Sequence, residues 1–163
     1  MNHKESFLQF LQIEKRYSPH TVRSYRNDLD QFANFLSDNE MLSDVNDITS
    51  HQIRAWIVYL IDNGISPVTV HRKISCLRRF YNYLRKEGIV KTDPLEKIVL
   101  PKQKKKLPVF VEEEALDRLF DSVNFGNDFS GLRNRTIIEM LYMTGIRRAE
   151  LTEIRYEDVS LSD

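Results

Sequence analysis

Apolar side chains recur at steps of three and four residues along most of the chain, a spacing typical of amphipathic helices. The pattern predicts a first helix within residues 5–17 and a second that begins at Ser18 and Pro19. Serine suits a helix N-cap and proline suits the first helical position. The apolar positions of these two helices are Phe7, Leu8, Phe10 and Leu11, followed by Val22, Tyr25, Leu29, Phe32, Ala33 and Leu36.

A third helix is predicted from Thr49 or Ser50 to Gly64, and a fourth begins at Ser66 and Pro67. The fourth resembles the second at an offset of 48 residues, with eight of 19 positions identical. Either two helical hairpins are built alike, or any two Ser-Pro-capped amphipathic helices look this similar. Both readings predict a compact four-helix domain. The predicted core stripe of the fourth helix is Val70, Ile74, Leu77, Phe80, Tyr81 and Leu84.

The helical pattern stops in the segment 93–108, which contains three prolines and a cluster of lysines. We interpret it as an extended cationic linker between two domains. Beyond it the pattern predicts a helix that starts near residue 111, a loop over 124–131, a buried helix that ends at Gly145, a short helix, and a lead into a strand. The predicted organisation is a helical domain at 1–100, a basic linker at 101–109 and an incomplete second domain at 110–163.

Composition fits a folded, water-soluble protein of 163 residues, with 41% hydrophobic and 29% charged residues. The single cysteine, Cys76, excludes an internal disulfide, and no signal or long apolar run is visible, so we expect a cytoplasmic protein without a membrane partner. The net charge of zero conceals an asymmetry. Residues 1–106 hold 18 Lys and Arg against 12 Asp and Glu, whereas residues 107–163 hold 6 against 12.

The basic excess points to a polyanion, and it is concentrated on one helix face. A helix of this kind can lie in the major groove of duplex DNA, with arginines that reach phosphates or guanine edges. The alternative is an ordinary solvated helix followed by a linker. The candidate DNA-binding residues come from the second helix, the fourth helix and the linker: Arg23, Ser24, Arg26, His71, Arg72, Ser75, Arg78, Arg79, Lys102 and Lys104.

Other chemistry-bearing residues carry little signal. The four histidines lack metal-ligand spacing, and no phosphate loop or Ser-His-Asp order is present, so neither a metal nor a cofactor is predicted. Cys76 is expected to be a buried or half-buried thiol rather than a nucleophile.

The stretch MTGIRRAEL, residues 143–151, places two arginines after a glycine that permits a tight turn. The start of the next short helix, together with an arginine fork, could bind an anion such as a phosphate. Glu150 lies three residues after Arg147, so it could orient the guanidinium. A plain surface Arg–Glu pair is the alternative.

TGIRRAEL closely resembles the arginine box of the tyrosine recombinases, the family of Xer-type recombinases and phage or transposon integrases. The Ser-Pro helices resemble the second and fourth helices of that family's SAM-like core-binding domain, and KLPVFVEEEALDRLF resembles the entry into its catalytic domain. The resemblance covers almost the whole chain.

The resemblance implies a mainly α chain: a four-helix core-binding domain, followed by the truncated helical start of a catalytic domain. The family breaks and rejoins duplex DNA through a 3′-phosphotyrosyl link, without metal or ATP, as a homo-tetramer. Arg147 matches the first catalytic arginine and Glu150 the supporting acid, whereas Arg148 falls where the family varies. The family's lysine hairpin, His-x-x-Arg box and nucleophilic tyrosine follow this box, and only 12 residues follow Leu151.

The resemblance therefore predicts the N-terminal half of a site-specific recombinase, which binds DNA without cleaving it. The alternative is a non-catalytic helical DNA-binding regulator or a protein-interaction module. The sequence identifies neither the DNA target nor the biological context, such as chromosome-dimer resolution or the mobility of a phage or transposon.

Overall fold

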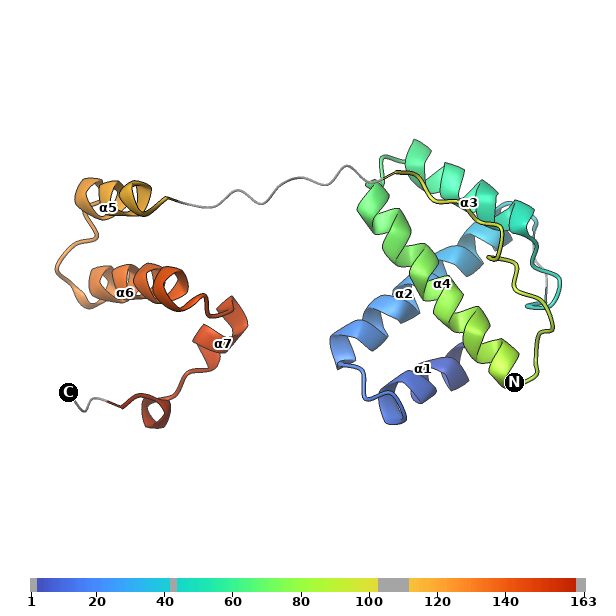
Figure 1. The fold of residues 1–163 in the computed structure, drawn as a ribbon, viewed down its shortest axis with the longest axis horizontal. Coiled ribbons are helices and arrows are strands. Elements are labelled where there is room, and N and C mark those ends of the chain that lie inside the picture. Colours follow the sequence, from blue (N-terminus) through green and yellow to red (C-terminus); the bar gives the residue numbers. More distant parts are fainter. Residues whose placement is uncertain (1–2, 42–43, 103–111, 161–163) are drawn as a thin grey trace. The chain divides into compact units, whose positions relative to one another are not determined.

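The computed structural model describes residues 3–41, 44–102 and 112–160. The chain divides into two compact units, Met1–Lys105 and Lys106–Asp163. The described residues are mainly helical and contain no strand. Figure 1 shows the two groups of helices.

The first unit contains the four helices expected from the sequence. They are α1 (His3–Ile13), α2 (Pro19–Asp38), α3 (Ser50–Asp62) and α4 (Pro67–Lys86). The helix starts follow the predicted local chemistry, since Ser18 Oγ accepts the Thr21 N–H at 3.2 Å and Ser66 Oγ accepts the Thr69 N–H at 3.3 Å. Proline occupies the first turn of both helices, where no intrahelical N–H bond is lost.

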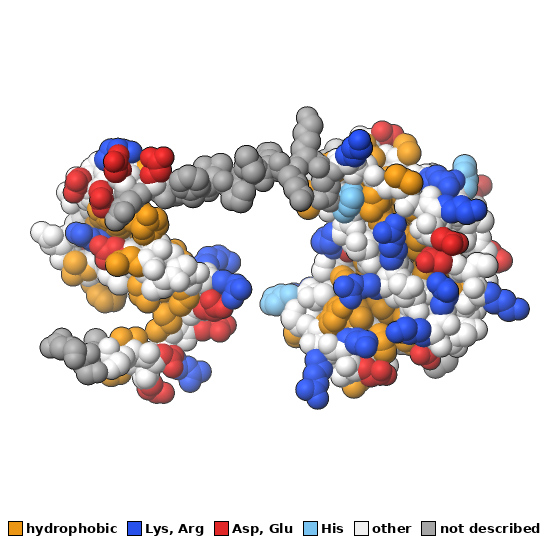
Figure 2. Space-filling model, viewed as in Figure 1, with side chains coloured by type: hydrophobic (Ala, Val, Ile, Leu, Met, Phe, Trp, Pro, Cys, Tyr) orange, Lys and Arg blue, Asp and Glu red, His pale blue; other side chains and the backbone are white. Residues whose placement is uncertain are grey.

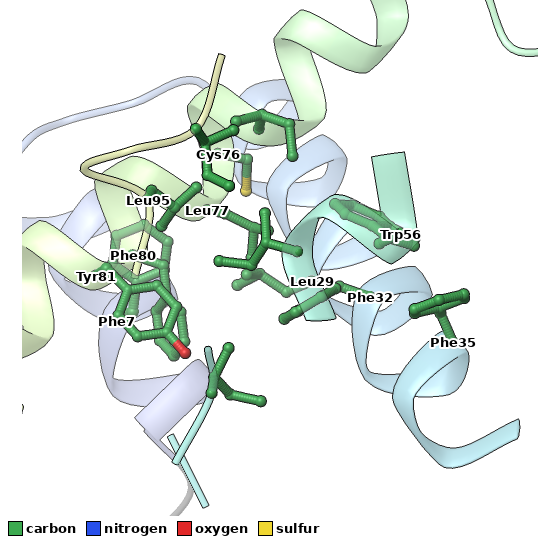
Figure 3. Close-up of a cluster of buried hydrophobic side chains, with 14 of the residues drawn as sticks. Phe7, Leu29, Phe32, Phe35, Trp56, Cys76, Leu77, Phe80, Tyr81 and Leu95 are labelled. Atoms are coloured by element: carbon green, nitrogen blue, oxygen red, sulfur yellow. The ribbon is translucent and has the colours of Figure 1, made fainter. Parts of the chain in front are cut away.

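The core of this unit lies where the four helices meet (Figure 3). The predicted stripe of α4 is buried along its whole length, and Val70, Ile74 and Leu84 have no exposed area. Aromatic rings fill the centre, with Phe32 against Trp56 at 4.9 Å between ring centroids and Phe7 against Phe80 at 5.3 Å. Burial of these large side chains is the main source of the unit's stability.

Part of the predicted linker belongs to this core. Leu95 and Ile98 are buried, and Figure 3 shows Leu95 within the same cluster as Leu77. The interpretation of 93–108 as a purely extended linker is therefore wrong for its first residues, because two apolar side chains fix the chain to the helices despite the flanking prolines. Residues 103–109 of the predicted linker lie outside the described residues.

The second unit contains α5 (Glu113–Ser122), α6 (Phe129–Thr144), α7 (Arg148–Glu153) and a 3₁₀ turn, η1 (Tyr156–Asp158). Asp128 caps α6 by accepting the Gly131 N–H at 2.9 Å. A Cβ on Gly131 would lie 2.0 Å from the Phe125 carbonyl oxygen, so only glycine fits there. Gly145 ends α6 as predicted, in the left-handed region at φ 64°.

Two expectations for this unit are wrong. The helix that ends at Gly145 is not buried: Met143 is 81% exposed, and within residues 112–160 no large apolar side chain is buried. The segment after α7 forms η1 rather than an approach to a strand, as far as residue 160. Both differences have one physical reason, since an apolar run and a strand each need neighbouring elements to pack or pair with.

Candidate nucleic-acid interface

The first unit carries a basic surface over α2 and α4. The 20 residues of α4 include no acidic side chain, and exposed cations occur from Arg72 to Lys86. In the view in which α4 crosses α2, Figure 2 shows Lys and Arg side chains gathered over these helices. We call this surface the α2–α4 face, defined by Arg23, Ser24, Arg26, His71, Arg72, Ser75, Arg78 and Arg79.

At the centre of the α2–α4 face, Arg72 joins a polar network that runs between the two helices. Both carboxylate oxygens of Asp28 accept from Arg72, Oδ1 from Nη2 at 2.9 Å and Oδ2 from Nη1. Nη1 also donates to Ser24 Oγ at 2.7 Å. Lys73 Nζ donates to Asp28 Oδ1 at 3.0 Å and to Gln31 Oε1. Arg72 is therefore tied to its own domain.

The burial of the network is uneven. The side chains of Asp28 and Lys73 are 2% and 6% exposed, whereas that of Arg72 is 44% exposed. A buried carboxylate is tolerated because it accepts several charge-assisted hydrogen bonds. Asp28 and Lys73 are not among the residues predicted from the sequence. In the sequence, both residues are recognisable only as charged side chains next to the apolar stripes of α2 and α4. This pattern does not reveal which side chains of the two helices contact one another.

Three other predicted arginines also make internal contacts. Arg26 pairs with Glu5 through two hydrogen bonds of 2.5 and 2.8 Å, and this pairing lowers the pKa of Glu5. Arg78 Nη2 donates to the Ile98 carbonyl at 3.1 Å. Arg79 donates to the Tyr17 hydroxyl and lies over that ring. These contacts orient the arginines while leaving them at the surface.

The remaining predicted residues differ in their surroundings. Arg23 and Ser75 are exposed. His71 Nε2 lies 2.7 Å from the Pro101 carbonyl oxygen, which ties α4 to the segment after the core. Lys102 is exposed beside that segment, and Lys104 lies outside the described residues.

The arginine box in the second unit forms a local hydrogen-bonded turn. Glu150 accepts the backbone N–H of Arg147 at 2.9 Å and a guanidinium N–H of Arg147 at 2.7 Å. These two bonds lower the pKa of Glu150. The structure thus brings together the predicted pair, with the Arg147 side chain 83% exposed at the start of α7. The backbone N–H of Arg147, at the N-cap of α7, is thus already used by Glu150. Arg148 is exposed at the first position of α7.

Within 3–41, 44–102 and 112–160, no group of three or more His, Cys, Asp or Glu side chains is placed to hold a metal ion. None of the helices there is both long and apolar enough to span a membrane.

Residues 5–88 match the model of the phage integrase N-terminal SAM-like domain. Tyrosine recombinase XerC of Oceanobacillus iheyensis is 42% identical over 158 residues, which cover 97% of this chain and 51% of that protein. Tyrosine recombinase XerC of Staphylococcus aureus is 40% identical over 162 residues, 98% of this chain and 53% of that protein.

A solved structure of XerA recombinase aligns with 97% of this chain and 51% of that chain, at 23% identity and a TM-score of 0.48. The chain spans about half the length of the curated relatives it matches. With its SAM-like domain at residues 5–88 and its XerC-like sequence throughout, the chain belongs to the phage integrase family of tyrosine recombinases and corresponds to their N-terminal half.

Proposed function

We propose that this chain binds duplex DNA through the α2–α4 face, as the DNA-binding part of a tyrosine recombinase. The observation that carries the proposal is the absence of any acidic side chain along α4, beside a row of exposed cations. Such a surface attracts the phosphate backbone and gains free energy from the release of counterions. In this proposal the protein acts in the cytoplasm, on a DNA recombination site.

The catalytic contribution of the chain is limited to Arg147 in this proposal. In the complete recombinase, Arg147 holds the scissile phosphate, and Glu150 fixes the guanidinium through the 2.7 Å contact. Strand cleavage needs the tyrosine, lysine and His-x-x-Arg groups that follow the arginine box in the family. This chain alone therefore binds DNA without breaking it, and the complete protein works on DNA as a homo-tetramer.

The test is a binding titration with labelled duplexes that carry candidate recombination sites. Affinity should fall about 100-fold between about 50 and 200 mM salt if about four phosphates are neutralised. Arg23→Gln should weaken binding and flatten the salt dependence, because an exposed cation of the α2–α4 face is lost. The matched control is Arg54→Gln, which removes an exposed arginine from α3 and should leave binding unchanged.

The same protein is then incubated with a nicked suicide duplex. We expect no covalent protein–DNA adduct under denaturing electrophoresis. Binding that is insensitive to salt would contradict the role of the α2–α4 face, and a covalent adduct would contradict the restriction to binding.

A further inference from the structure

The network around Asp28 has an uncompensated positive charge. One carboxylate is shared by two basic side chains, Arg72 and Lys73, so the three side chains together have one formal positive charge. Lys73 is buried, whereas nearly half of the Arg72 side chain is exposed. Arg72 is therefore the cationic member of the network that reaches solvent.

The hydrogen bonds also determine which edge of that guanidinium stays available. A guanidinium has five N–H groups. Three are used, two on Nη1 by Ser24 and Asp28 and one on Nη2 by Asp28. The covalent geometry of arginine puts the other two, on Nε and Nη2, along one edge of the planar group, and no acceptor among the described residues contacts them. This edge has the spacing that two oxygens of a phosphate match.

An arginine held in this way differs from a free surface arginine such as Arg23. A free side chain loses rotamer entropy when it binds, whereas the orientation of Arg72 is already fixed by Asp28 and Ser24. Lysine cannot replace Arg72 in this role, because an ammonium group is not planar and has no second edge of N–H groups that could bind a phosphate while the first contacts Asp28.

We propose that Asp28 and Lys73 are positioning residues for DNA binding. Asp28 orients Arg72 so that the Nε and Nη2 edge of its guanidinium binds one backbone phosphate in a bidentate manner. Lys73 compensates the negative charge of Asp28, so that this charge does not weaken the attraction between Arg72 and the phosphate. The inference rests on the proposed DNA binding of the α2–α4 face. It assigns a binding role to two side chains that are too buried to touch DNA.

The experiment measures duplex affinity and its salt dependence for Lys73→Met, Arg72→Lys and Asp28→Asn, with circular dichroism to verify folding. Lys73→Met should weaken binding about fivefold and flatten the salt dependence, although the residue lies beneath the surface. Arg72→Lys keeps the charge and should bind about tenfold more weakly with a similar salt dependence. Asp28→Asn raises the net charge, so a purely electrostatic role predicts tighter binding, whereas positioning predicts weaker binding.

The outcomes separate this inference from the proposed function. Salt-sensitive binding by the unaltered chain, together with unchanged binding by Lys73→Met and Arg72→Lys, would overturn the positioning role and leave the DNA-binding face intact. Salt-insensitive binding by the unaltered chain would remove the proposed function itself. Where Asp28→Asn or Lys73→Met does not fold, Arg72→Lys decides the matter, because it leaves the buried Asp28–Lys73 pair in place.

Discussion

At the scale of single residues, several polar side chains of the first unit make specific contacts with other residues of that unit. Asp28 is the clearest case, since its removal would leave Lys73 buried without its charge partner. Removing one member of a buried ion pair typically costs about 3–5 kcal/mol of stability. Cys76 lies in the same crossing of α2 and α4, and it offers a simple probe of that burial.

Cys76 should react with thiol reagents only when the first unit opens. Its Sγ contacts the Tyr25 carbonyl oxygen at 3.7 Å, and burial raises the pKa of the thiol to about 12. Because the thiolate is the reactive form, labelling of the native chain should stay slow at pH 8 and above, and should become fast in denaturant. The measurement is the rate of reaction with a chromogenic disulfide. Rapid labelling of the folded chain would show that the α2–α4 crossing is not closed.

At the scale of elements, the two long helices of the first unit are begun by the same capping device. Ser18 and Ser66 each accept a backbone N–H three residues ahead, and their hydroxyls lie 2.9 and 3.0 Å from those of Thr21 and Thr69. Each cap satisfies a donor that would otherwise have no intrahelical partner.

Ser66→Ala should lower the free energy of unfolding by about 1 kcal/mol, because the Thr69 N–H loses its acceptor. Ser66→Gly should cost only a few tenths of a kcal/mol, since glycine leaves the helix end open to water. Ser18→Ala is the matched substitution in α2 and should have a similar effect. Urea denaturation followed by circular dichroism gives both values, and equal stability of all the variants would mean that the caps contribute nothing.

The sequence predicted the helices of the first unit well because capping and apolar spacing are local properties. Ser66, Pro67 and the stripe of α4 determine where that helix begins and which face is buried. Leu95 and Ile98 could not be recognised as core, since the apolar residues between Pro94 and Pro101 form too short a run to show a periodicity. The Asp28–Arg72 contact joins residues 44 positions apart, so it depends on how the helices cross.

At the scale of the whole molecule, the two units differ in how much apolar surface they bury. The first has a continuous core from Phe7 to Ile98. The second, over residues 112–160, buries no large apolar side chain and exposes Phe129, Leu132 and Met143. Short helices without tertiary packing are only marginally stable in water. We call these exposed apolar side chains the apolar face of the second unit, and a surface of this kind favours association.

Hydrogen exchange should resolve this difference. Backbone amides of α2 and α4 should exchange slowly, near the rate set by global unfolding, whereas those of α5 and α6 should exchange within seconds to minutes. Mass spectrometry of peptic fragments gives both rates in one experiment. Equal protection of the two units would indicate that the apolar face of the second is covered, and a concentration-dependent gain in protection would identify a second copy as the cover.

Some contacts between α2 and α4 join positions that correspond to one another at the 48-residue offset. Ser24 touches Arg72, which is its own counterpart at the 48-residue offset. The contact between Asp28 and Lys73 has its counterpart in the contact between Cys76 and Tyr25. The chemistry of these contacts is divided unequally between the two helices, since α2 supplies the carboxylate and α4 supplies the two cations. This division leaves the net positive charge on the α4 side of the crossing.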